Sequence, residues 1–177
     1  SLTASITVTP ATVAEDGTTN LVYTVTLNTT ASTPTTVNLT TTGTATSGTD
    51  YTGAVTSVTI PAGSTTATVT IDPTADTVVE PDETVIITVA TGTGYTVGTP
   101  SSATGTITND DSLTASITVS PATVLENGAT NLVYTVSLNT TSATDTVVNL
   151  TTTGTATSGT DYTGAVTSVT IPAGSTT

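Results

Sequence analysis

The sequence predicts an all-β protein made of antiparallel β-sandwich domains repeated in tandem. Threonine makes up about a third of the 177 residues, and this β-branched residue favours strands, where its methyl group packs and its hydroxyl faces water. Short runs of alternating apolar residues recur with turn residues between them, which is typical of half-buried strands. The beginning of the sequence also returns almost unchanged after residue 111. No segment has the apolar spacing of a helix.

The first repeat begins with four predicted strands, over residues 2–8, 21–27, 37–42 and 58–60. In the first two, an apolar residue stands at every second position, so one face of each strand is predicted to be buried. The third ends in a run of threonines, and the fourth is closed by the turn sequence Pro-Ala-Gly.

Three further strands are predicted over residues 67–71, 85–89 and 103–107. The turn between the first two is the acidic sequence DTVVEPDE, residues 76–83, which holds four carboxylates in eight residues. Like charges so close together repel each other, and a hard cation among them relieves that repulsion. A solvated acidic loop without a cation is the alternative. Seven short strands separated by turns indicate an antiparallel sandwich.

The composition excludes several classes of function. The chain has no Lys, Arg, His or Cys and thirteen acidic residues, which gives a formal charge of −13. Without Lys or Arg it lacks the groups that bind phosphates, so we expect no nucleic-acid partner. Without His or Cys it lacks the usual bases, thiolates and zinc ligands, so we do not expect an enzyme.

The absence of Cys also makes disulfides impossible, which leaves bound metal as the cross-link for an extracellular protein. No apolar run has the length of a transmembrane helix, so we expect no membrane insertion in this segment.

One complete copy of a repeated unit and the first part of a second copy account for the whole sequence. Residues 1–66 and 112–177 match at 57 of 66 positions, and the repeat length of 111 residues is normal for one sandwich domain. Residues 1–111 are therefore predicted to be one complete repeat, and residues 112–177 the start of a second, with its strands one to four only. No Gly/Ser-rich or Pro-rich spacer separates the copies. We expect the sequence to be a window from a longer tandem array whose repeats abut.

The ordered motifs of the repeat resemble those of the Calx-β domain. They are Glu15-x-Gly17, GTATSGTDY at residues 43–51, IPAG at 60–63, DTVVEPDE at 76–83 and TITNDD at 106–111. The second repeat carries the first three again, as LENG at residues 125–128, GTATSGTDY at 154–162 and IPAG at 171–174. The resemblance implies a seven-stranded immunoglobulin-like sandwich. Such domains occur in the calcium sensors of sodium–calcium exchangers, in integrin β4 and in large bacterial surface proteins.

In the calcium-binding members of this family, loops at one end of the sandwich supply the ligands. Carried over motif by motif, the implied ligands are Glu15, Asp50, Asp76, Glu80, Glu83, Asp110 and Asp111 in the first repeat, with Glu126 and Asp161 in the second. Ca²⁺ takes six to eight oxygens from carboxylates, carbonyls and water, which agrees with this acidic set. The exchanger sensors carry three consecutive acids before the EPDE-like turn, whereas Asp76 stands alone here. We therefore expect fewer ions or weaker binding, in the range of about 10⁻⁴–10⁻³ M of extracellular modules. Alternatively, the aspartates of the GTATSGTDY motifs only cap turns, and the glutamates of the acidic turn only add charge to a strand edge.

We expect a structural repeat of a secreted or cell-surface bacterial protein, such as an adhesin stalk, a matrix component or a fibre. Calcium at the loop and junction carboxylates would make the array rigid. The expected partners are neighbouring repeats of the same chain, with other copies in a fibre or matrix left open. The alternative is a ligand-binding module that recognises glycans or ice through rows of threonine on its strands. Ice binding needs a flat array of threonines, whereas the faces of a sandwich are twisted, which favours the structural role.

Overall fold

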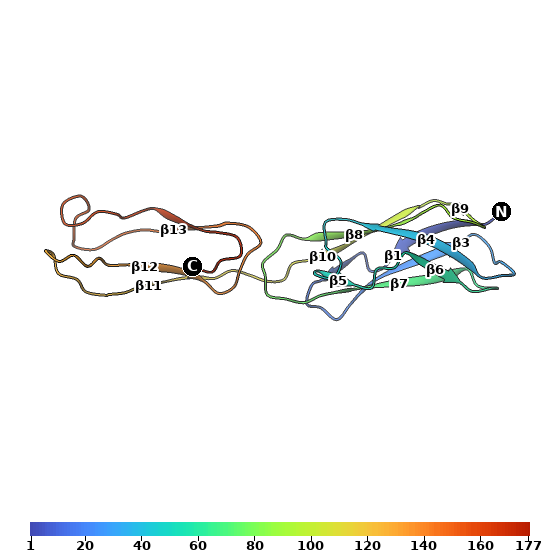
Figure 1. The fold of residues 1–177 in the computed structure, drawn as a ribbon, viewed down its shortest axis with the longest axis horizontal. Helices are drawn as coiled ribbons and strands as arrows, with labels where there is room; N and C mark the ends of the chain where they lie inside the picture. Colours follow the sequence, from blue (N-terminus) through green and yellow to red (C-terminus); the bar gives the residue numbers. More distant parts are fainter. The chain divides into compact units, whose positions relative to one another are not determined.

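The computed structural model describes all 177 residues as two compact units built of strands and turns (Figure 1). Unit 1 comprises Ser1–Asp76 and Pro81–Asp110, and unit 2 comprises Thr77–Glu80 and Asp111–Thr177. The prediction of an all-β sandwich fold is confirmed. No helix of the length and apolarity needed to cross a membrane is present.

Unit 1 is a sandwich of two five-stranded sheets. In the first sheet the order is β5 (Tyr51–Thr52), β7 (Thr66–Pro73), β3 (Leu21–Leu27), β1 (Thr3–Val8) and β9 (Thr96–Val97). In the second it is β2 (Thr12–Ala14), β10 (Ser102–Thr108), β8 (Glu83–Val89), β4 (Thr35–Thr42) and β6 (Ser57–Ile60). All neighbouring strands are antiparallel except two edge pairs, β1 with β9 and β2 with β10, which are parallel.

The seven strands predicted for the first repeat correspond to β1, β3, β4, β6, β7, β8 and β10. Three more strands, β2, β5 and β9, were not predicted. They are only two or three residues long, which is too short to show an alternation of apolar residues. Two of them extend the sheets by the parallel edge pairs, and β2 proves important for the site described below.

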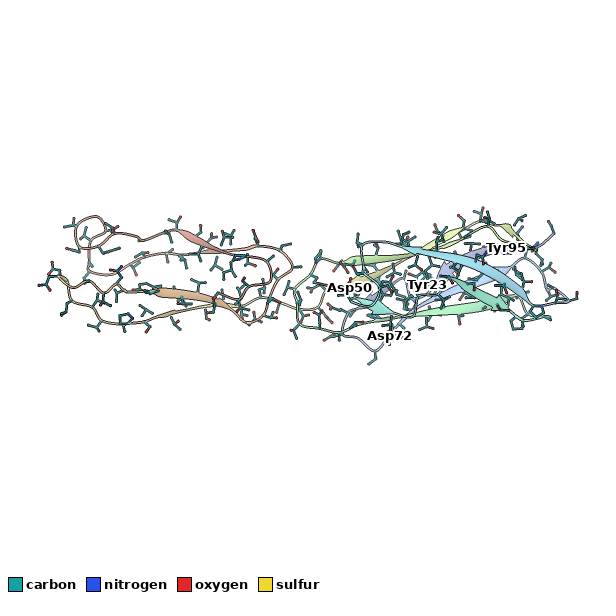
Figure 2. The ribbon with its side chains drawn as sticks, viewed as in Figure 1. Tyr23, Asp50, Asp72 and Tyr95 are labelled. Carbon is teal, nitrogen blue, oxygen red and sulfur yellow. The ribbon has the colours of Figure 1, made fainter.

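The core of unit 1 forms where the two sheets face each other. Along β3 every second residue is buried, in the order that the sequence pattern predicts. The largest fully buried side chain is that of Tyr23, which lies inside unit 1 (Figure 2). Its hydroxyl donates a hydrogen bond to the carbonyl oxygen of Val85 at 2.6 Å. Burial raises the pKa of Tyr23 to about 12, against a smaller lowering by a backbone hydrogen bond with Gly105. A side chain at Gly105 would collide with the same hydroxyl, so this position has room only for glycine.

Unit 2 contains four strands in two pairs. β11 (Ala115–Val119) pairs with β12 (Tyr134–Leu138), and β13 (Thr146–Asn149) pairs with β14 (Ser168–Ile171). Its small core consists of Val136, Leu138 and Ile171 with partly buried neighbours. The segment Thr77–Glu80 belongs to this unit, where Val79 forms a parallel bridge with Ser142.

Large apolar side chains are exposed in unit 2 at positions that are buried in unit 1. Tyr134 is 61% exposed, whereas Tyr23 at the same repeat position is fully buried. In unit 1 the sheet that faces Tyr23 includes β8 and β10, and residues 112–177 include no counterpart of those two strands.

Candidate metal centre

A first group of carboxylates joins Glu15, Asp76 and Asp111, each of which offers an oxygen within 4.8 Å of the others. Glu15 is only 6% exposed, which is unusual for a carboxylate in a chain that has no Lys, Arg or His. One side-chain oxygen of Asp111, Oδ2, is also shielded from solvent. Burying a carboxylate is costly unless an opposite charge compensates it, so this group favours a bound cation.

The parallel pair of β2 and β10 explains why Glu15 and Asp111 lie together. Ala14 at the end of β2 is opposite Thr108 at the end of β10, and the N–H of Glu15 donates to the carbonyl oxygen of Thr108 at 3.0 Å. Parallel strands end at the same edge of a sheet, so the residues that follow both strands share one edge. Asp76 enters this region from the chain that follows β7.

A second group consists of Asp50, Glu80 and Glu83, with one oxygen of each again within 4.8 Å of the others. All three residues are partly buried. Oxygen ligands of one Ca²⁺ ion, each at 2.3–2.6 Å, lie no more than about 5 Å apart. The spacing in both groups therefore suits ligands of a single hard cation.

Hydrogen bonds fix the loop that carries Asp50 to the start of the strand that carries Glu83. The N–H of Thr84 donates to the hydroxyl oxygen of Thr44 at 2.9 Å, and the N–H of Ala45 donates to the carbonyl oxygen of Thr84 at 3.0 Å. The backbone of Asp50 is held as well, because its carbonyl oxygen accepts a hydrogen bond from the N–H of Thr74 at 2.9 Å. These hydrogen bonds hold the loop of Asp50 beside the start of β8, where Glu83 lies.

The side chain of Asp50 is also oriented by its own turn. Its Oδ2 accepts a hydrogen bond from the N–H of Thr46. Asp161 repeats this contact in unit 2, where its Oδ2 accepts from the N–H of Thr157 at 2.7 Å. Both aspartates therefore cap turns, as the alternative interpretation of the sequence proposed, and Asp50 also lies in an acidic group.

The structure brings together six of the nine residues that the sequence singled out. The other three, Asp110, Glu126 and Asp161, are exposed and lie in neither group. Residues 112–177 correspond to residues 1–66, so the counterparts of the ligand candidates from Asp76 to Asp111 are not among them. For all nine residues, the role of calcium ligand stays a prediction.

Two features of the structure were not predicted from the sequence. The sequence showed that the acids are numerous but not that they form two separate groups of three. It also did not show the pairing of Val79 with Ser142, because a strand segment of four residues carries no signal for its partner. The only local hint was the pair of β-branched residues Val78 and Val79 between two acids.

Comparison with known proteins assigns both repeats to the same domain family. The model of the Calx-beta domain matches residues 2–111 and again residues 109–177. The crystal structure of the apo form of the Calx CBD1 domain is 28% identical, with a TM-score of 0.52, and the match covers 62% of this chain and 99% of that domain. No curated protein sequence matches the chain.

Two structures that contain the calcium binding domain CBD12 also match. The one from CALX1.1 is 29% identical with a TM-score of 0.51, covering 60% of this chain and 44% of that one. The one from CALX1.2 is 23% identical with a TM-score of 0.51, covering 97% of this chain and 72% of that one. At that lower identity the likeness shows the fold alone.

Proposed function

The chain belongs to the Calx-beta domain family over both of its repeats, and we propose that it is a calcium-stabilised structural module of an extracellular protein. The similar structure from CALX1.1 is of a calcium binding domain, which supports calcium as the ion. We propose no catalytic role, since the chain has neither His nor Cys.

The observation that carries this proposal is the group of Glu15, Asp76 and Asp111. Three carboxylates within 4.8 Å repel each other strongly when all are ionised, and the chain has no side-chain cation to neutralise them. A hard divalent cation removes the repulsion and takes oxygen ligands only, which is the chemistry that this donor set offers. Thiolate and imidazole ligands are absent, so the donor set does not suit zinc.

Each group supplies three carboxylates, fewer than the six to eight oxygens that Ca²⁺ requires. Backbone carbonyls and water would complete the shell. Such a site has weak affinity, and we propose the range of about 10⁻⁴–10⁻³ M that is typical of extracellular modules. Outside the cell, calcium is abundant enough to fill sites of this affinity.

The structural role follows from where the first group lies along the chain. Asp111 is a ligand candidate and is followed at once by Ser112, the first residue of the second repeat. We propose that an ion held by Asp111 restrains the chain at the start of the next repeat. An adhesin stalk, a matrix protein or a fibre, secreted or on a bacterial surface, would use such rigidity.

Calcium titration of the 177-residue chain tests the binding. We expect saturable heat on addition of CaCl₂, reduced by Glu15→Gln in the first group and by Glu83→Gln in the second. The matched control is Asp72→Asn, because Asp72 is an exposed acid outside both groups (Figure 2). If Asp72→Asn weakens binding as much as the two glutamate variants, the ion is held only by the general negative charge of the surface.

A second candidate function rests on the outer face of the first sheet. Thr7 is paired with Thr24, and Thr24 with Thr68, so a row of threonines crosses three strands. Such a row could bind ice or a glycan through regularly spaced hydroxyl and methyl groups. Inhibition of ice recrystallisation by the chain, abolished by Thr68→Tyr, would favour this function over the structural one.

A further inference from the structure

In unit 2, residues 140–143 bind the segment Thr77–Glu80 through main-chain hydrogen bonds. The N–H of Val79 donates to the carbonyl oxygen of Thr141 at 3.1 Å, and the N–H of Ala143 donates to the carbonyl oxygen of Val79 at 3.0 Å. The hydroxyl of Thr140 adds a hydrogen bond to the carbonyl oxygen of Thr77 at 2.6 Å. An extended Thr-Val-Val-Glu segment is therefore bound in parallel along residues 140–143.

Unit 1 contains the corresponding segment, residues 29–32. These residues correspond to residues 140–143 at the repeat offset of 111, with two of the four positions identical. The carbonyl oxygen of Thr30 and the N–H of Ser32, which correspond to the groups that bind Val79, make no hydrogen bond within the protein. Ser32 is exposed to solvent. Main-chain groups that have no partner within the protein are available to pair with an added extended segment.

The segment is held in the same conformation in both units. The N–H of Gly63 donates to the carbonyl oxygen of Ala31 at 2.9 Å, and the N–H of Gly174 donates to the carbonyl oxygen of Ser142 at 2.9 Å. The asparagine before the segment makes the same hydrogen bond in both units. In unit 1, the side-chain oxygen of Asn28 accepts a hydrogen bond from the N–H of Thr3 at 2.8 Å. In unit 2, Asn139 accepts from the N–H of Thr114 at 2.6 Å. The two segments thus share the same local hydrogen bonds.

The surroundings in unit 1 suit such an occupant. A hollow of about 440 Å³ lies beside the segment, lined by residues that include Leu2, Ala31 and Pro34. None of the lining residues has an ionisable side chain, so the acids that flank the valines would meet no like charge there. One contact is lost, because Ala31 replaces Ser142, whose hydroxyl donates to the carbonyl oxygen of Val79 at 3.4 Å.

We infer that Thr29–Ser32 of unit 1 binds an extended Thr-Val-Val-Glu segment of another repeat by parallel main-chain pairing. The partner that fits is the turn between the strands equivalent to β7 and β8 of another repeat of this kind. The interaction requires no calcium. The negative charge of the whole chain opposes it, so it strengthens as salt screens that charge.

A peptide with the sequence of residues 74–83, TADTVVEPDE, tests the inference on the full 177-residue chain in the presence of a chelator. By NMR we expect saturable shifts at the amides of residues 30–33. We expect none at residues 141–143, where the site is already occupied. The matched peptide carries Val79→Pro, which removes the donating N–H, and should bind about tenfold more weakly. Higher salt should tighten binding of the unmodified peptide.

In the protein, Ser32→Pro removes the other main-chain donor and should weaken binding of the unmodified peptide by a similar factor. The amide of Gly63, bonded to Ala31, reports whether this variant keeps its fold. Should it lose the fold, the comparison of the two peptides still decides, because it leaves the protein unchanged. Equal binding of both peptides, or no saturable shift at residues 30–33 up to millimolar peptide, overturns the inference.

Discussion

Asp50 accepts a hydrogen bond from the backbone N–H of Thr46, and its carboxylate also lies in one group with those of Glu80 and Glu83. Asp161 makes the same contact with Thr157 in the second repeat but belongs to no acidic group. The two aspartates therefore separate the capping of a turn from the binding of a cation.

Asp50→Asn and Asp161→Asn should have equal, small effects on stability in chelator. Asparagine keeps an oxygen that accepts the hydrogen bond, so we expect a loss of less than about 1 kcal/mol for each. Only Asp50→Asn should reduce the stabilisation by calcium, as measured by thermal unfolding with and without CaCl₂. An equal reduction by Asp161→Asn would show that the GTATSGTDY motif acts as a cap alone.

A second pair of variants tests the contact that holds the loop of Asp50 beside the start of β8. Gly43 has a φ of 127°, and a side chain there would collide with the carbonyl oxygen of Thr84, next to Glu83. Gly154 has a φ of 137° at the same repeat position but has open space around it. Gly154→Ala should cost about 1 kcal/mol from the backbone conformation alone, whereas Gly43→Ala should cost more than about 2 kcal/mol.

Chemical denaturation monitored by residue-resolved NMR would assign each loss to its unit. Gly43→Ala should also weaken calcium binding, because the shift of Thr84 displaces Glu83. Equal costs for the two alanine variants would mean that the close approach of Gly43 to Thr84 does not constrain the loop.

The hydroxyl of Tyr23 makes stability depend on pH in the alkaline range. Its pKa of about 12 in the folded protein lies above the ordinary value of 10. As pH rises from about 10 to 12, the unfolded chain loses this proton while the folded protein keeps it, so the free energy of unfolding falls. Tyr23→Phe should remove this contribution and should cost about 1–3 kcal/mol at neutral pH, since Val85 loses its hydrogen bond.

The control for Tyr23 is Tyr134→Phe at the same position of the second repeat, where the side chain is 61% exposed. We expect it to leave the stability of unit 1 unchanged at all pH values. An alkaline decline of the same size in wild type and Tyr23→Phe would show that the buried tyrosine is not its source.

The longer strands could be predicted from the sequence because alternation is a local property. In β3 and β7 the buried positions follow every second residue, and the pairing of Tyr23 with Val69 places both in the same layer of the core. The motifs that carry the resemblance, such as GTATSGTDY, also identified the family from the sequence alone. Short edge strands lack such a pattern, which is why β2, β5 and β9 were missed.

The grouping of the acids could not be predicted because it depends on contacts far apart in the sequence. Glu15 and Asp111 meet only because β2, three residues long, pairs in parallel with β10. Asp110 was predicted alongside Asp111 from the same motif, but Asp110 is exposed, and only Asp111 lies in a group. Sequence position thus identified the candidates, and topology selected among them.

The proposed restraint at the start of the second repeat can be measured by small-angle scattering of the 177-residue chain. With calcium we expect a single, well-defined maximum dimension, and with chelator a broader distribution of dimensions. Asp111→Asn should behave like the chelated protein, because it removes one ligand of the first group. Asp110→Asn removes the same charge outside the group and should behave like wild type. Identical scattering in all four samples would show that calcium does not restrain the junction.

Thermal unfolding of unit 1 with and without calcium tests the central claim most directly. Calcium that binds only the folded state stabilises it by mass action, by roughly 2.7 kcal/mol per independent site at about a hundred times the dissociation constant. We therefore expect the melting temperature to rise with millimolar calcium over its value in chelator, and to rise less in the Glu15→Gln variant. Identical melting temperatures in calcium and in chelator would contradict the account and leave a plain acidic sandwich.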